Sequence, residues 1–121
     1  MTLGEALELT DRRRPNLYSR EEKILWLQEV EGMVWGALEA FHAVLGTYPG
    51  IAPEDFPDKK LLLPKAYTGL YSLCLEGSMY YADQEYLLYN NAMARFNTLW
   101  KDFFAWCCRT IPQPAKSIRY L

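Results

Sequence analysis

The sequence predicts an all-α fold: a small bundle of about four helices with a long proline-rich loop over 46–64 and an extended C-terminal tail. Three observations predict this class. Apolar residues recur every three or four positions through most of the chain, which is the spacing of an amphipathic helix. Apart from Pro15, the prolines gather in the loop and after residue 111. With 121 residues, 50% of them hydrophobic, the chain has the size of one domain, expected over 1–111 and followed by the tail over 112–121.

The first helix is expected over about 3–11. Thr2 and Glu5 have the spacing of a capping box, in which a hydroxyl and a carboxylate each accept a hydrogen bond from a free backbone N–H group. Three consecutive arginines follow, and their positive charge suits the negative end of the helix dipole. They are also candidate interface residues, because arginines bind phosphate or an acidic partner well: Arg12, Arg13 and Arg14.

A second, longer helix is expected over about 20–44. It starts after Ser19, which again stands three residues before a glutamate. Its apolar residues form one stripe that should face the core: Leu27, Val30, Val34, Leu38, Phe41 and Leu45. Gly32 and Gly36 lie one turn apart and would let another helix approach closely, so both are candidate interface residues.

The segment 46–64 contains Gly46, Gly50 and four prolines, so a helix cannot pass through it. An irregular loop of this length is uncommon inside a compact domain. We therefore expect either a mobile element or an arm that binds a neighbour. The three leucines at 61–63 either dock into the core or pair as a brief strand.

Two further helices are expected over about 66–81 and 84–108, because no proline interrupts this part of the chain. Asp83 divides them as the expected N-cap of the second helix. Eleven of the eighteen aromatic residues lie in this region, which is more than one core stripe needs. The surplus suggests burial against several neighbours, with other subunits among them.

Tyr89, Asn90 and Asn91 form the one polar feature inside the last apolar helix. Asparagine is a poor helix former, so the pair indicates a local break, hydrogen bonds to another helix or a solvated face. All three are candidate interface residues. The tail adds three more residues that could anchor on a partner: Ile118, Arg119 and Tyr120.

The net charge of −2 hides an uneven distribution. Residues 1–58 hold 11 acidic and 5 basic side chains, a balance of −6, whereas residues 59–121 hold 4 acidic and 8 basic side chains, a balance of +4. Such halves either attract each other within one monomer or bring neighbouring copies into head-to-tail contact. A net acidic chain lacks the general basicity of nucleic-acid-binding proteins.

The sequence lacks the patterns that mark catalysis, metal binding and membrane targeting, so we expect no enzyme, no metal and no cofactor. His42 is the only histidine, and the fragment from Glu39 to His42 is half of the Glu-x-x-His pair that a di-metal bundle site needs twice. Cys74, Cys107 and Cys108 have the spacing of neither a disulfide framework nor a zinc site and are expected to be reduced. No glycine-rich phosphate loop occurs. Without a secretory signal or a long apolar run, the chain is expected in the cytoplasm.

Several short elements, spread over most of the chain, resemble those of one known family. They are Thr2-Leu3, Arg14-Pro15-Asn16 with Tyr18 before a long helix, Ala66-Tyr67 with Leu70-Tyr71, Glu85 with Tyr89-Asn90-Asn91, Phe96-Asn97 and Arg109-Thr110. The family is that of the head-tail connector (adaptor or head-completion) proteins of tailed phages and of prophages in Gram-positive bacteria. This chain departs from the family at Cys107-Cys108, where aromatic residues are expected.

The resemblance implies an all-helical subunit that forms a ring of twelve copies beneath the portal of the filled capsid, seals it and offers a platform to the tail. The implied partners are further copies of the chain, the portal protein, and the tail-side connector or tail proteins. DNA only passes through the ring, and no membrane takes part. The implied locations are the cytoplasm of the bacterial host during assembly and the virion neck. Two other classes stay open: a small regulatory or binding module with an aromatic groove and, less favoured, a metal-dependent helical-bundle enzyme.

Overall fold

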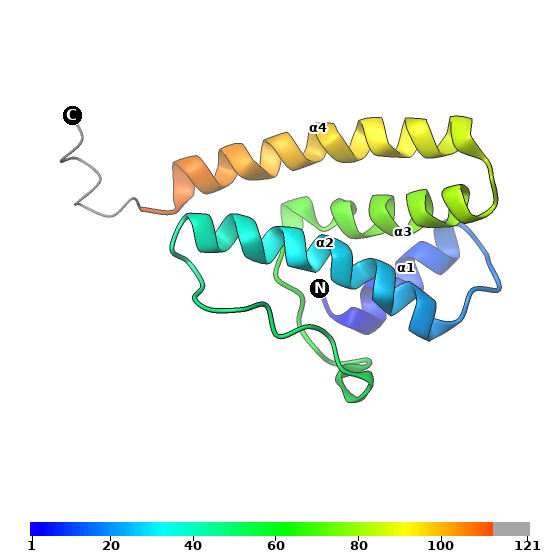
Figure 1. Cartoon of the computed structure of the whole chain (residues 1–121), viewed down its shortest axis with the longest axis horizontal. Helices are drawn as coiled ribbons and strands as arrows, with labels where there is room; N and C mark the ends of the chain where they lie inside the picture. The colour runs from blue at the N-terminus through cyan, green and yellow to red at the C-terminus, as the bar shows by residue number, and fades with distance from the viewer. Residues whose placement is uncertain (113–121) are drawn as a thin grey trace.

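The computed structural model describes residues 1–112, which form four α-helices and two short 3-10 turns (Figure 1). The helices are α1 (Leu3–Arg13), α2 (Arg20–Ala40), α3 (Gly69–Ala82) and α4 (Tyr86–Thr110), and the turns are Pro53–Asp55 and Lys65–Tyr67. The predicted all-α class is confirmed. The predicted tail lies outside the described residues, apart from Pro112.

The central helix of the bundle is α3, since it contacts each of the other three. In Figure 1, α4 lies along one side of α3, and α1 and α2 lie on the other side. The helices α2 and α4 run in the same direction across the bundle, whereas α3 runs in the opposite direction between them. One side of α2 and one side of α4 therefore face away from the core, on opposite sides of α3.

The starts of α1 and α2 follow the predicted caps. The Glu5 N–H donates to the Thr2 hydroxyl at 3.2 Å, and the Thr2 N–H donates to the Glu5 carboxylate at 3.0 Å, which completes the capping box. These bonds hold the pKa of Glu5 below its ordinary value. At α2, the Ser19 hydroxyl accepts a bond from the Glu22 N–H at 3.1 Å. The predicted apolar side of α1 is buried at Leu3, Ala6 and Leu7.

The helix α2 is shorter than predicted, because it ends at Ala40 and not near residue 44. His42 takes left-handed backbone angles (φ 62°), and the N–H group of the following residue donates to the Leu38 carbonyl at 2.9 Å. This is a Schellman ending, which usually has glycine at the left-handed position. The predicted core stripe is buried in its first half and wrong at its end, where Leu45 is 81% exposed.

The helix α3 also has a Schellman ending, at its boundary with α4. Asp83 is the C-cap of α3, so its prediction as the N-cap of α4 is wrong. Gln84 takes left-handed angles (φ 61°), and the Glu85 N–H donates to the Tyr80 carbonyl at 2.8 Å. The helix α3 begins slightly later than predicted, after the second 3-10 turn, and α4 then runs without a break.

The long loop between α2 and α3 folds back against the start of α1. The Leu3 N–H donates to the Lys59 carbonyl at 2.8 Å, and the Gly4 N–H donates to the Pro57 carbonyl at 2.9 Å. A β-carbon on Gly4 would lie 2.6 Å from the Pro57 β-carbon, so the close approach of the loop requires glycine there. The loop is thus held by backbone hydrogen bonds along part of its length.

At the end of the loop, the leucines dock into the core, which is one of the two predicted outcomes, and they form no strand. Leu61 and Leu63 are buried in the core. Between α1 and these leucines, Lys60 forms an isolated antiparallel bridge with Thr2. The leucines therefore dock into the core next to a single strand-like pairing.

A buried polar network fixes this end of the loop to α2 and α3. Glu31 is 1% exposed, and its carboxylate accepts bonds from the Leu62 N–H at 3.0 Å and from the Tyr71 hydroxyl at 2.9 Å. The Tyr71 oxygen in turn accepts a bond from the Leu63 N–H at 2.9 Å. Burial raises the pKa of Glu31, and the two bonds that its carboxylate accepts oppose this rise.

Replacing Tyr71 with phenylalanine is expected to lower the free energy of unfolding by about 1–3 kcal/mol, because the Glu31 carboxylate and the Leu63 N–H each lose a buried partner. Equilibrium denaturation with urea measures the loss. Tyr67→Phe is the matched control, because the Tyr67 hydroxyl bonds no other described residue. A Tyr71→Phe variant as stable as Tyr67→Phe would show that the network contributes little.

The helix α4 packs on α3 through a seam of aromatic side chains. Phe103 is fully buried, and its ring lies among three others, with centroids 5.5, 5.6 and 6.1 Å away: Trp100, Tyr67 and Trp106. At Gly77 of α3 an added β-carbon would lie 2.4 Å from the end of the Met93 side chain. Some of the aromatic residues in this region thus pack in the core, whereas three are exposed: Tyr81, Tyr86 and Phe104.

Candidate interaction surfaces

The described residues offer little to a metal ion or to nucleophilic chemistry. Within residues 1–112, no three histidine, cysteine, aspartate or glutamate side chains lie close enough to hold a metal ion. Glu39 and His42 do not share a helical face, because α2 ends between them. Burial raises the pKa of Cys74 to about 12 and also raises the pKa of Cys107, which disfavours both thiolates. No helix in this part of the chain has the length and apolar character needed to cross a membrane.

Of the three candidate arginines, two are used within the molecule. Arg14 reaches the turn between α3 and α4, where its guanidinium lies 2.7 Å from the Asp83 carboxylate, and its side chain is only 18% exposed. Arg13 pairs with Glu76 of α3 at 3.5 Å. Arg12 is exposed. Two of the arginines therefore tie the end of α1 to α3 and to the turn that follows it.

Asp83 links three segments at this end of the bundle. Its carboxylate accepts hydrogen bonds from the Tyr18 hydroxyl and from the Arg14 guanidinium. These bonds hold the pKa of Asp83 below its ordinary value of 3.8. A carboxylate whose pKa is lowered in the folded state stabilises the fold above its ordinary pKa and loses this contribution as the pH falls through the lowered value.

The variant Asp83→Asn is expected to show a weaker dependence of unfolding free energy on pH between about pH 5 and pH 2, because it has no carboxyl group to protonate at this position. Thermal unfolding at a series of pH values measures the difference. Asp102→Asn is the matched control, since Asp102 is exposed and bonds no other described residue. Identical acid dependence in the two variants would contradict a stabilising role for the Asp83 bonds.

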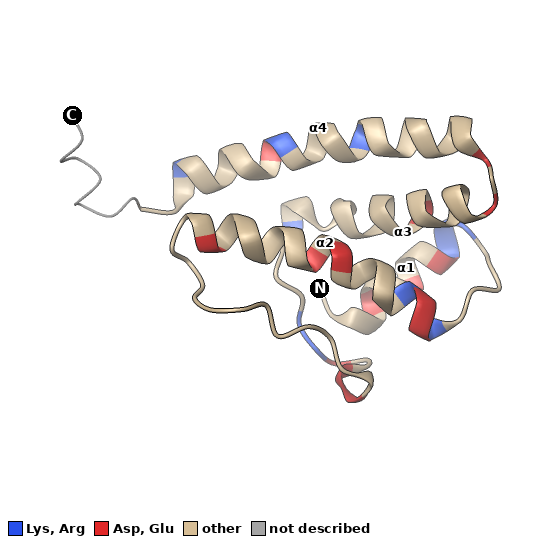
Figure 2. Cartoon of the chain, in the orientation of Figure 1, with Lys and Arg blue, Asp and Glu red and all other residues tan. Residues whose placement is uncertain are grey.

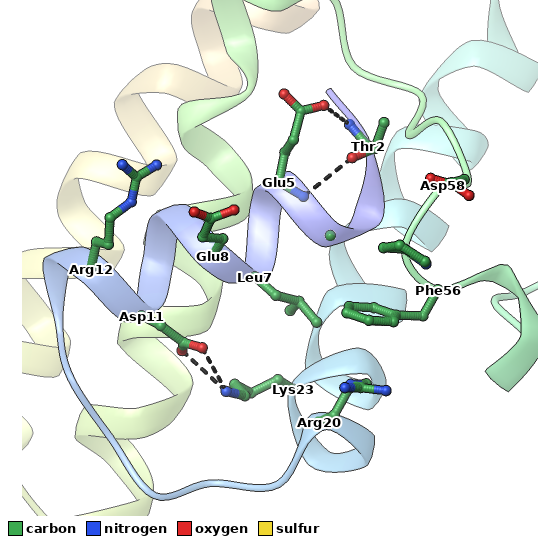
Figure 3. A pocket seen from close by; sticks show the side chains of 12 residues that line it. Thr2, Glu5, Leu7, Glu8, Asp11, Arg12, Arg20, Lys23, Phe56 and Asp58 are labelled. Carbon is green, nitrogen blue, oxygen red and sulfur yellow. Dashed lines mark hydrogen bonds and ion pairs between the residues drawn. The ribbon is translucent and has the colours of Figure 1, made fainter.

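A cleft of about 730 Å³ lies between α1, the start of α2 and the loop (Figure 3). The Arg20 guanidinium stacks over the Phe56 ring at 3.9 Å, and the Lys23 ammonium lies 3.0 Å from the Asp11 carboxylate. Figure 3 shows the Lys23 and Asp11 side chains pointing toward each other, with Arg12 at the edge. Within the cleft, Lys23 and Asp11 neutralise each other, and acidic and basic side chains line it together, so it does not present a site of one charge.

The candidate residues Tyr89, Asn90 and Asn91 lie near the start of α4, and the helix does not break there. The Tyr89 ring is half-buried, 5.2 Å from the Tyr81 ring, whereas both asparagines are exposed and bond no side chain among the described residues. Tyr81 and Tyr89 also line a shallow groove of about 310 Å³ between α2, α3 and α4. Trp26 and Glu29 of α2 line the groove as well.

The outward side of α2 is one exposed stripe, which we call the α2 face: Glu22, Leu25, Glu29, Met33, Gly36 and Ala40. Leu25 is 61% exposed and Met33 is 47% exposed. A β-carbon on Gly36 would meet no atom within 4 Å, whereas a β-carbon on Gly32 would lie 3.8 Å from the Tyr48 ring. Of the two candidate glycines, Gly36 is therefore open on the face, and the loop partly covers Gly32.

The outward side of α4 is a second exposed stripe of mostly small residues, which we call the α4 face: Leu87, Asn91, Ala94, Thr98, Lys101, Ala105 and Cys108. Arg95 and Arg109 flank the stripe, and Asp102 is the acidic residue of α4. Figure 2 shows Lys and Arg spaced along α4 and Glu spaced along α2, with Arg20 and Lys23 near the start of α2 and Asp102 next to Lys101 in α4. The two faces therefore differ in charge as well as in position.

Leu25 and Met33 belong to the α2 face, although the sequence patterns did not single them out. Their signal is a second helical stripe, opposite the core stripe, in which apolar residues alternate with glutamates. The tail candidates lie outside the described residues: Ile118, Arg119 and Tyr120. No family model, curated protein sequence or solved structure matches this chain.

Proposed function

We propose that this chain is a structural subunit of phage assembly, resembling the head-tail connector proteins, that forms a ring by binding copies of itself. The ring docks under the portal protein and provides the platform for the tail-side connector or tail proteins. It holds twelve copies, as the resemblance implies, and DNA passes through it. Assembly takes place in the cytoplasm of the bacterial host, and the mature ring lies in the virion neck.

The observation that supports this proposal is the pair of outward faces on opposite sides of α3. A surface that binds a different surface on the next copy makes a head-to-tail contact, and repeated contacts of this kind close into a ring when the rotation between copies allows it. The α2 face carries exposed apolar side chains together with glutamates, and the α4 face carries Lys101, with Arg95 and Arg109 beside it.

The proposal is tested by mixing the purified chain with the portal protein encoded in the same phage or prophage genome. Analytical ultracentrifugation should show the chain sedimenting with the portal, and negative-stain electron microscopy should show a ring added to one end of the portal. Portal, capsid and tail genes are expected to flank the gene. A chain that remains a monomer at every ratio and does not bind the portal would contradict the proposed function.

A further inference from the structure

We infer that the α2 face of one copy packs against the α4 face of the next copy in a parallel arrangement, with Glu29 opposite Lys101. The inference rests on the proposed function, because it assumes a ring of identical copies. It adds the identity of the two surfaces, their relative direction and their register.

Both faces are without a partner inside the described part of the monomer. Leu25 and Met33 expose 61% and 47% of their surface, and space above Gly36 is open. On α4, every member of the α4 face is exposed. Covering Leu25 and Met33 with the small side chains of α4 would remove apolar surface from water, which favours association.

The ion pairs of the monomer leave the two faces with opposite charges. Arg13 and Arg14 belong to residues 1–58, which are acidic overall, and they pair with acidic residues of 59–121, which are basic overall. Because these pairs neutralise the minority charge of each half, the charge difference between the remaining unpaired side chains is larger. Within residues 1–112, no ion pair includes the exposed glutamates of α2 or the basic residues of α4: Glu21, Glu22, Glu29 and Glu39, and Arg95, Lys101 and Arg109.

One register matches the two faces in charge and in side-chain size. When Lys101 is placed opposite Glu29 and both helices run in the same direction, Ala105 falls opposite Met33 and Cys108 falls opposite Gly36. The long Met33 side chain then meets a small residue, and two small residues meet at the open glycine. At the start of the contact, Glu22 falls beside Arg95.

The parallel direction follows from the fold and from ring symmetry. Within one copy, α2 and α4 run in the same direction (Figure 1). A rotation by one twelfth of a turn changes the direction of a helix only slightly, so α2 of one copy and α4 of the next remain close to parallel. An antiparallel contact would need neighbouring copies to be inverted, which a cyclic ring does not contain.

A disulfide cross-link tests the register. The variant Gly36→Cys places a thiol opposite the exposed natural Cys108 of the next copy, and the open space above Gly36 accommodates the side chain. The full-length variant, alone at high concentration and bound to the portal, is treated with a mild oxidant and run on a non-reducing gel. We expect dimers and longer ladders, with mass spectrometry identifying the link between residues 36 and 108.

Two variants serve as controls, and each outcome has a definite meaning. Cys108→Ser in the Gly36→Cys background should remove the ladder, and Leu17→Cys, whose side chain is fully exposed away from both faces, should give no ladder. If the chain assembles but residues 36 and 108 do not link, the inferred contact is overturned and the proposed function stands. If the chain neither assembles nor binds the portal, both are overturned.

Discussion

The variant Phe103→Ala is expected to lose about 3–5 kcal/mol of unfolding free energy. Phe103 is fully buried, and its ring lies among three others: Trp100 and Trp106 of α4, and Tyr67 of the 3-10 turn before α3. Removing the ring leaves a cavity that this rigid aromatic cluster cannot fill. Equilibrium denaturation monitored by circular dichroism measures the loss.

The neighbouring residue provides a matched control. Phe104 is 43% exposed and its ring contacts Phe41 at a centroid distance of 5.3 Å, so Phe104→Ala should cost much less than Phe103→Ala. The two variants remove the same side chain from adjacent positions of one helix. Equal losses would mean that α4 does not face α3 through the aromatic seam described above.

Reversing one charge of the inferred contact is expected to weaken assembly roughly 100-fold, because like charges that face each other across an interface are strongly unfavourable. The variants are Glu29→Lys and Lys101→Glu. Both side chains are exposed in the monomer, so the stability of the isolated chain should change little. Sedimentation velocity over a range of concentrations, with and without the portal, measures the effect.

The double variant is the stronger part of this test. With Glu29→Lys and Lys101→Glu in the same chain, every contact again joins opposite charges, so assembly should recover most of the lost affinity. A charge reversal at Glu8, which is exposed on α1 and belongs to neither face, serves as the control and should leave assembly unchanged. A double variant weaker than both single variants would contradict the pairing of these two residues.

Much of the fold follows from local patterns that a reader of the sequence can see. The capping residues Thr2 and Ser19 mark the starts of α1 and α2 correctly, because an N-cap depends on residues within one turn. The helix ends are less predictable. His42 adopts left-handed angles that usually call for glycine, so the sequence carries no clear signal where α2 stops, whereas α3 ends within one residue of the predicted position 81.

Long-range contacts explain what else the sequence did not predict. Arg14 binds Asp83, 69 residues away, and this partner becomes visible only when α1 and α3 are packed together. Glu31 is a charged residue on the core side of α2. Its burial is stabilised by hydrogen bonds from the Leu62 N–H of the loop and the Tyr71 hydroxyl of α3, which are distant in sequence. Charged side chains that a local pattern assigns to the surface can therefore form hydrogen bonds or ion pairs within the folded chain.

The candidate surfaces were likewise predictable only in part from the sequence. The sequence singled out Gly32 and Gly36 alike, and only the structure shows that Gly36 is open while Tyr48 of the loop lies above Gly32. The charge contrast between the halves was also visible, but its meaning depended on which arginines are used inside the monomer. Only the structure shows that Arg13 and Arg14 pair with acidic residues of the segment 59–112, and that the exposed glutamates of α2 form no ion pair among the described residues.

The most direct test of the central claim is a three-dimensional reconstruction, by electron cryomicroscopy, of the chain assembled on its portal at a resolution that separates helices. We predict a closed ring in which α2 of each copy lies parallel to α4 of the next, with Glu29 near Lys101. A ring joined through other helices would contradict the inferred contact, and the absence of any ring on the portal would contradict the proposed function itself.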